Sequence, residues 1–328
     1  MRIFLFHLSS LLLFFVVTSV ARPAFAQSGA IDRPQQADYP VRPVMPASRQ
    51  LLLAARDVAT RASNGKAAIH YGANPDSGMT MRINDIDLYY EVYGSGRPLL
   101  LLHGNGGSIA SLRKLIPYLA RHYQVIAVDS RAHGRSGDSD QELTFKLMAS
   151  DMAALIDALR LPPVLVVGWS DGGIVGLELA AAYPDKVAGL VASGANFVAD
   201  ASALPADAVD PAQAVWFRQL GMFEQLGHIV RSHFPRRAPL IYDKVLNLDL
   251  KYPNFTLAEL GKIQTPVLVV AGDHDQIIDT HTLALFHALP HADLFIVPHS
   301  THSVLRDRPQ LLSTMIAEFF DTPFHDLK

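Results

Sequence analysis

A serine lies between glycines at a point where a buried strand pattern turns into a helical pattern. The apolar run Val164 to Val167 leads directly into Gly168-Trp169-Ser170-Asp171-Gly172, and helical spacing begins at Ile174. A strand, a sharp turn and a helix in this order form the setting in which the GxSxG motif presents a nucleophilic serine. The small glycines let the backbone make that strained turn. Ser170 is therefore the predicted nucleophile, and an ordinary strand-to-helix turn is the alternative.

A serine hydroxyl is a weak nucleophile at neutral pH, so it needs a base and a carboxylate that orients the base. In sites of this kind the acid follows the serine along the chain and the histidine comes last. The segments Gly272-Asp273-His274-Asp275 and Pro298-His299-Ser300-Thr301-His302 each follow an apolar strand pattern. Open α/β sheets place their sites at the carboxyl ends of such strands. The candidate acids are Asp273 and Asp275, and the candidate bases are His299 and His302.

The segments that must position these residues alternate between continuous apolar runs and helical patterns. Apolar runs without polar alternation are typical of strands covered on both faces of a largely parallel sheet. The sequence therefore predicts an α/β fold with a mostly parallel central sheet and helices on both faces. A hairpin at the turn Asn84-Asp85 is predicted to come first. The predicted strands are Thr80–Ile83, Ile86–Tyr93, Pro98–Leu102, Gln124–Asp129, Val164–Val167, Val187–Ser193, Val267–Ala271 and Asp293–Val297, and the predicted crossover helices include Leu143–Leu161 and Ile174–Tyr183.

The first part of the chain differs from the rest. The apolar run Ile3 to Val20 precedes small residues, a pattern that predicts a signal peptide over residues 1–26, cleaved after Ala26. A retained membrane anchor is the alternative, because the run approaches the length that spans a bilayer. We expect a periplasmic or secreted protein with no stable membrane partner after cleavage. Residues 27–78 are interpreted as an extension and residues 79–328 as the catalytic domain.

One connection inside that domain is longer than a single crossover helix. The stretch from Val198 to about Lys262 carries several broken helical patterns and is predicted to be a helical cap insertion. An elaborate crossover with its own small core is the alternative, because aromatic residues at helical spacing usually indicate packing. The large apolar residues of this stretch include Trp216, Phe217, Met222, Phe223 and Phe234.

Composition argues against several classes of function. The 28 basic and 31 acidic residues give a net charge of -3 and are scattered, which argues against a nucleic-acid partner. The absence of cysteine excludes disulfides, thiolate zinc sites, iron–sulfur clusters and a cysteine nucleophile. The stretch Gly104 to Gly107 has neither a full dinucleotide fingerprint nor a P-loop lysine. We expect no cofactor and no metal, since His299 and His302 lack a nearby third ligand.

Taken together, the motifs resemble the α/β-hydrolase superfamily over roughly Met79 to the C-terminus. The resemblance is carried by the Ser170 turn, the acid and histidine segments described above, and the two loops His103-Gly104-Asn105-Gly106-Gly107 and Asp129-Ser130-Arg131-Ala132-His133-Gly134-Arg135-Ser136. It implies that Asp275 is the acid and His302 the base, which leaves Asp273 to cap a turn.

The same resemblance implies where a developing oxyanion is stabilised. One donor is the backbone N–H of Asp171, directly after the nucleophile, and the other is that of Asn105, with Gly106 as the alternative. His103 is expected to hold the glycine-rich loop through hydrogen bonds. Asp171, Trp169 and Gly106 are the residues expected to contact substrate.

A serine at the turn argues against the dehalogenase and epoxide hydrolase branches, which use an aspartate. Gly168 to Ile174, together with Ser193-Gly194-Ala195-Asn196, is similar to the amino-acid ester hydrolases of the valacyclovir hydrolase type. That similarity implies that Asp171 binds a substrate ammonium. An exposed carboxylate favoured by the helix dipole is the alternative.

The predicted function is hydrolysis of a small-molecule carboxylic ester by a Ser-His-Asp triad through an acyl-enzyme. Three alternatives use the same triad: a C–C bond hydrolase, an aminoacyl-ester hydrolase and a peptidase. An alternative of another class is a ligand-binding protein that keeps the hydrolase fold without catalysis.

Overall fold

The computed structural model describes residues 69–74, 76–205 and 238–324. The chain divides into two units, Met1–Lys66 and Ala67–Lys328, and all described residues belong to the second. The predicted signal peptide, most of the extension and the cap residues 206–237 lie outside the described residues. Within the described ranges, no helix is both long enough and apolar enough to cross a membrane.

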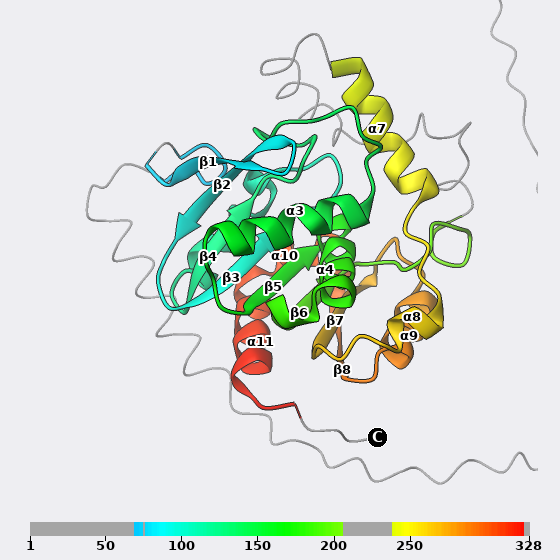
Figure 1. The fold of residues 1–328 in the computed structure, drawn as a ribbon. Coiled ribbons are helices and arrows are strands. Elements are labelled where there is room, and N and C mark those ends of the chain that lie inside the picture. Colours follow the sequence, from blue (N-terminus) through cyan, green and yellow to red (C-terminus); the bar gives the residue numbers. More distant parts are fainter. Residues whose placement is uncertain (1–68, 75, 206–237, 325–328) are drawn as a thin grey trace, which may run out of the picture. The chain divides into compact units, whose positions relative to one another are not determined.

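An eight-stranded sheet forms the centre of the second unit (Figure 1). Its strand order is β1-β2-β4-β3-β5-β6-β7-β8, with β1–β2 and β2–β4 antiparallel and the remaining pairs parallel. The predicted α/β architecture, with a mostly parallel sheet after an initial hairpin, is confirmed. The strands are β1 (Gly78–Ile83), β2 (Ile86–Tyr93), β3 (Arg97–Leu102), β4 (Tyr123–Val128), β5 (Val164–Trp169), β6 (Val187–Ser193), β7 (Val267–His274) and β8 (Ala292–Thr301).

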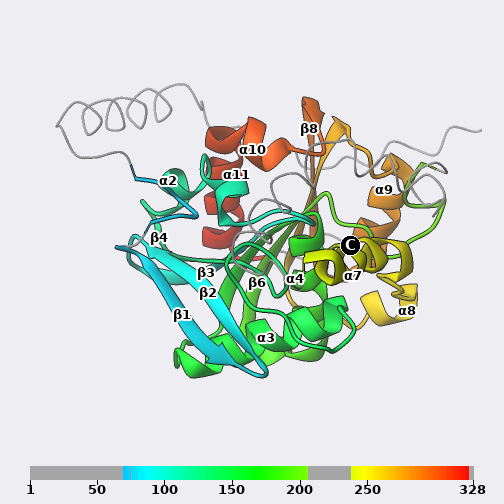
Figure 2. The same ribbon diagram turned by 90° about the horizontal axis from the view of Figure 1, so that it is seen from above.

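Helices cover both faces of this sheet (Figure 2). Because neighbouring residues of a strand point to opposite faces, Leu100 and Leu102 pack in one apolar core with α3 and α4. Leu99 and Leu101 pack in a second core with α2 and α11. The helices are η1 (Ile109–Leu112), α2 (Ile116–Leu119), α3 (Phe145–Ala158), α4 (Asp171–Ala182), η2 (Pro184–Lys186), α7 (Ala238–Lys251), α8 (Leu257–Leu260), α9 (Asp279–Ala288), α10 (Val304–Asp307) and α11 (Pro309–Asp321).

A buried carboxylate ties the chain before β1 to the sheet. Glu91 on β2 is fully buried and accepts hydrogen bonds from the backbone N–H groups of Gly72 at 2.6 Å and Asn74 at 3.0 Å. The hydroxyls of Tyr89 and Tyr93 also donate to it, at 2.7 and 2.6 Å. Four donors offset the cost of burying a charge. The segment around residues 72–74 is therefore part of the folded unit.

Candidate active site

Ser170 sits in a strained turn between β5 and α4. Its backbone angles, φ of 54° and ψ of -121°, lie in a region that residues other than glycine rarely adopt. The flanking glycines leave the necessary space: a Cβ at Gly168 would lie 2.1 Å from the carbonyl oxygen of Gly172, and one at Gly172 would lie 2.4 Å from that of Leu102. The Ser170 N–H donates to the carbonyl of Ser193 at 2.7 Å. The predicted strand-turn-helix context of the serine is confirmed.

Two candidate residues from neighbouring strand ends meet as an acid–base pair. Nδ1 of His302 lies 2.7 Å from Oδ1 of Asp275, and both side chains are largely buried. Asp273 faces elsewhere, because its carboxylate accepts the backbone N–H groups of His299 at 2.9 Å and Ser300 at 3.0 Å. The structure brings Asp275 and His302 together, and their catalytic roles stay predictions. Asp273 binds the backbone of the distant histidine segment instead of the local turn that was expected for it.

The loop ends around the histidine leave little room for its ring to turn. Oδ1 of Asp275 also accepts the N–H of Ile277 at 3.0 Å, which fixes the carboxylate. Gly194, at the end of β6, has a φ of +61°, and a Cβ there would lie 2.8 Å from two atoms of the His302 ring. A glycine at this position therefore lets the imidazole lie against the backbone.

Trp169 joins the serine turn to the histidine loop. Its side chain is 5% exposed, and its indole N–H donates to the carbonyl of His302 at 2.8 Å. The guanidinium of Arg306 stacks over the indole, 5.3 Å from the ring centre. Among the described residues, the Ser170 hydroxyl and the His302 ring do not form a hydrogen bond. Such bonds often tighten only when substrate binds. The expected contact of Trp169 with substrate stays a prediction.

The glycine-rich loop after β3 passes directly over the nucleophile. A Cβ at Gly104 would lie 3.0 Å from the Cβ of Ser170. His103 holds this loop: its Nδ1 donates to the carbonyl of Gly104 at 2.7 Å, and its Nε2 accepts the N–H of Ser130 at 3.1 Å. Burial lowers the pKa of His103 to about 3, so the ring is neutral at physiological pH. The loop-holding role expected for His103 is confirmed.

Asn105 connects this loop to the cap. Its side-chain amide donates to the carbonyl of Val245 on α7 at 3.1 Å, and Nε2 of His133 lies 3.5 Å from its Oδ1. Gly106, the next residue, is buried and has a φ of 63°. The oxyanion role of Asn105 and the substrate contact of Gly106 stay predictions.

Two carboxyl groups meet beside the nucleophile. Asp171, the first residue of α4, is 4% exposed, and its Oδ2 has no hydrogen-bond partner among the described residues. The alternative of an exposed helix-terminal carboxylate is therefore wrong. Burial raises the pKa of Asp171 well above its usual range, and the adjacent carboxyl of Asp249 raises it further.

Asp249 projects from α7 of the cap and shares this environment. Burial raises its pKa to about 6, although hydrogen bonds from Asn105 and Asp171 and the nearby His302 lower it. Two adjacent carboxyls, one buried and one half-buried, resist ionising together, which favours a shared proton or a cation between them. Sequence reasoning missed Asp249, because an isolated acid in a mixed helical pattern is typical of a solvated face.

The described residues contain no group of three metal-ligating side chains.

The family model described as alpha/beta hydrolase fold matches residues 97–257. The chain is 30% identical over 246 residues to the "Putative carbamate hydrolase RutD" of Variovorax paradoxus, which covers 66% of this chain and 89% of that protein. The "Putative carbamate hydrolase RutD" of Azorhizobium caulinodans is 43% identical over 106 residues. These residues make up 32% of this chain and 40% of the length of that protein.

Two further proteins extend the similarity over most of the described domain. The human "Serine hydrolase BPHL" is 27% identical over 271 residues, which cover 78% of this chain and 90% of that protein. Among solved structures, a serine hydrolase involved in carbazole degradation superimposes with a TM-score of 0.62 at 22% identity, covering 75% of this chain and 99% of that one. The matched region contains the Ser170 turn and the strands around it.

Proposed function

Because the chain belongs to the α/β-hydrolase family and is a hydrolase of that fold, we propose that it cleaves carboxylic esters with Ser170, His302 and Asp275. The observation that carries the proposal is the 2.7 Å contact between Asp275 and His302. The indole of Trp169 connects the backbone of His302 to the strained turn that holds Ser170. A structural turn alone explains neither the buried carboxylate behind the histidine nor the strain at the serine.

In the proposed reaction, Oγ of Ser170 attacks the ester carbonyl carbon while Nε2 of His302 takes the hydroxyl proton. Asp275 accepts the Nδ1–H of His302, which fixes the tautomer and stabilises the imidazolium. The C–O bond to the alcohol then breaks, and His302 returns the proton to the leaving alkoxide. Water attacks the acyl-enzyme with His302 again as base, which releases the acid and restores Ser170.

Backbone donors are proposed to stabilise the oxyanion in both steps. The N–H of Asp171 lies at the start of α4, where helix N-termini favour negative charge. The N–H of Asn105 lies on the loop that His103 holds over Ser170. Preorganised donors of this kind contribute about 3 kcal/mol each to the rate.

The proposal is tested with Ser170→Ala and with a fluorophosphonate probe on the wild-type protein. We expect Ser170→Ala to lose at least about 10³-fold in kcat on p-nitrophenyl butyrate, because the nucleophile is gone. Ser193→Ala is the matched control, since the Ser193 carbonyl that accepts the N–H of Ser170 belongs to the backbone and stays in place. Full activity of Ser170→Ala, or no probe adduct on Ser170 in folded protein, would rule out the mechanism and favour a non-catalytic binding protein.

The acid pair favours one substrate class within this proposal. An ammonium group next to the ester would neutralise Asp171 and Asp249 without a shared proton, as expected for an aminoacyl ester. This specificity rests on side chains, whereas the oxyanion donor of Asp171 is its backbone. Substitution of the side chains can therefore separate the two roles.

The comparison uses phenylalanine ethyl ester and the matched 3-phenylpropionic acid ethyl ester, which lacks the amine. We expect Asp171→Asn and Asp249→Asn each to lower kcat/KM for the amino ester by about tenfold or more, with little change for the neutral ester. Asp243→Asn, at an exposed acid on the same helix, is the control. Equal losses on both esters would show that the pair does not recognise the amine.

We further propose that the protein is exported and cleaved after Ala26, since the leader pattern ends in small residues there. Mass spectrometry of protein recovered from the periplasm or medium should give a chain that begins at Gln27. A full-length chain retained in the membrane fraction would instead support the anchor.

A further inference from the structure

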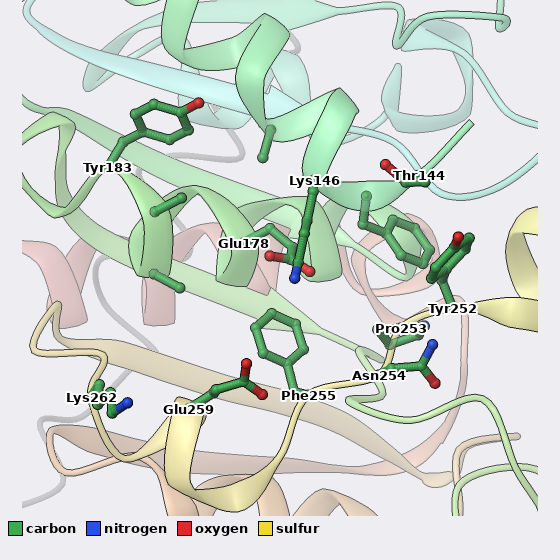
Figure 3. A pocket seen from close by; sticks show the side chains of 14 residues that line it. Thr144, Lys146, Glu178, Tyr183, Tyr252, Pro253, Asn254, Phe255, Glu259 and Lys262 are labelled. Atoms are coloured by element: carbon green, nitrogen blue, oxygen red, sulfur yellow. The ribbon is translucent and has the colours of Figure 1, made fainter. Parts of the chain in front are cut away.

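A cavity away from the candidate active site lies between α3, α4 and the segment that follows α7 (Figure 3). Its volume is about 710 Å³, within the range of sites that hold small organic ligands. The first turn of α3, the second half of α4 and the segment 252–262 form its walls.

This cavity is separate from the triad. None of Ser170, Asp275 and His302 lines it. Its charged wall residue Glu178 lies eight positions after Ser170 on α4, which is about 12 Å along the helix axis at 1.5 Å per residue.

Glu178 is the polar group at the buried side of the cavity. Its side chain is 7% exposed and makes no hydrogen bond among the described residues. Every other residue of α4 after Asp171 is apolar or glycine, so a charge stands where packing alone would favour leucine. Burial raises the pKa of Glu178 to about 7. An unpartnered carboxyl costs stability here, and a ligand that pairs with it would offset that cost.

The other charged wall residues lie at the exposed edge, where two lysines and one glutamate leave one positive charge in excess. Lys146, Glu259 and Lys262 are all exposed. Glu259 is already engaged, because it accepts the N–H and hydroxyl of Thr256 at 2.8 Å each. Lys146 attracts both Glu178 and Glu259 without forming an ion pair with either within the described residues. Among the charged wall residues, Glu178 is therefore the one at the buried end of the cavity.

Aromatic side chains supply the rest of the buried lining. Phe145 and Phe255 are buried, and Tyr252 lies beside Pro253 on the wall that follows α7. In Figure 3 the Glu178 carboxyl points into the cavity, with the end of Lys146 beside it and the ring of Phe255 facing it. Aromatic faces attract cations and pack against apolar bodies.

We propose that this cavity is a second ligand site that takes a small organic amine, with the ammonium on Glu178 and the apolar body against Phe145, Tyr252 and Phe255. The site stands independently of ester hydrolysis, because it shares no residue with the triad or the Asp171–Asp249 pair.

Calorimetric titration tests the site in Ser170→Ala/Asp171→Asn/Asp249→Asn protein, in which the proposed catalytic centre has lost its nucleophile and both carboxylates that could pair with an amine. The probes are 2-phenylethylamine, the neutral 2-phenylethanol and the anionic 3-phenylpropionate. We expect saturable one-to-one binding of the amine and at least tenfold weaker binding of both matched probes. Addition of Glu178→Gln should weaken amine binding at least tenfold, while Glu142→Gln, at an exposed acid outside the cavity, leaves it unchanged.

Several outcomes overturn the proposal: no saturable amine binding, equal binding of amine and alcohol, or amine binding that survives Glu178→Gln. The variant is isosteric and removes an unpaired carboxyl, so its melting temperature should not fall below that of the parent. If it nevertheless fails to fold, a crystal of the parent soaked with 2-phenylethylamine decides. Density for the amine against Glu178 supports the site, and density elsewhere or none rejects it.

Discussion

Asp275 and Asp273 lie two positions apart at the end of β7, and their carboxylates have different partners. Asp275 reaches the imidazole of His302, whereas Asp273 accepts backbone N–H groups of the histidine loop. In the proposed mechanism, the first contact acts on the protonation of His302. The second acts on the shape of the loop that carries it.

We predict that Asp275→Asn lowers kcat by about 10³- to 10⁴-fold, because an amide cannot stabilise the imidazolium and favours the wrong tautomer. Steady-state kinetics on p-nitrophenyl butyrate, with circular dichroism to verify folding, measures this loss. Asp273→Asn is the matched control, and we expect it to cost less than about tenfold. A larger loss for Asp273→Asn would reassign the acid.

The sequence located most of these residues but could not rank all of them. Strand ends and chain order limited the acid to two positions, and the family resemblance selected Asp275. Neither Asp249 nor Glu178 was predicted from the sequence as a site residue, for different reasons. Asp249 reaches the site through the packing of α7 on the loop that carries Asn105, whereas Glu178 did carry a signal, as a lone acid in an apolar helix.

At the scale of elements, the serine turn and the histidine loop are coupled through one indole. Trp169 ends β5, and its N–H reaches the backbone of His302 just beyond β8. Arg306 on α10 covers the other side of the ring. The relative positions of Ser170 and His302 therefore depend on this side chain.

We predict that Trp169→Phe lowers kcat about three- to tenfold with a smaller effect on KM, because one hydrogen bond that positions His302 is lost while the apolar packing stays. The pH profile of kcat should shift as well, since the histidine is held less firmly against Asp275. Trp169→Ala should cost more, through a cavity. An unchanged kcat and pH profile for Trp169→Phe would remove the positioning role.

Most strands were predictable because their apolar runs are buried on both faces, as in β3 and β5. The end residues of strands and helices were harder to predict. β8 continues from Val297 to Thr301 through polar residues, since it is the edge strand and pairs only with β7. α4 begins at Asp171, three residues before the helical pattern predicts, because the two glycines after Asp171 hide the helical spacing.

Across the whole molecule, buried titratable groups oppose one another in their effect on stability. The pKa of Asp129 and that of Glu178 are raised to about 7 by burial, so the folded state binds protons that the unfolded state has lost. Burial lowers the pKa of His103 to about 3 and that of His281 to about 4, so there the unfolded state binds more. The first effect makes stability fall as pH rises, and the second makes it rise.

A difference measurement isolates one group. We predict that the melting temperature of wild type, relative to that of Glu178→Gln, falls as pH rises from about 4.5 to about 7. In this range the unfolded state loses the Glu178 proton freely, whereas the folded state must either keep the proton or bury a charged carboxylate. Differential scanning calorimetry in steps of half a pH unit measures the difference. Glu142→Gln should give a flat comparison. A constant difference for Glu178→Gln would mean that its carboxyl is solvated.

The four hydrogen bonds to Glu91 decide where this domain can be shortened. A protein that begins at Ala67 keeps all four donors, whereas one that begins at Gly78 leaves the buried carboxylate with only the two tyrosine hydroxyls. Loss of two backbone donors to a buried charge costs about 1.5–3 kcal/mol each, a large share of ordinary domain stability. The smallest domain that folds well therefore starts upstream of its first strand, and exopeptidase trimming of the leader side should slow sharply near residue 70.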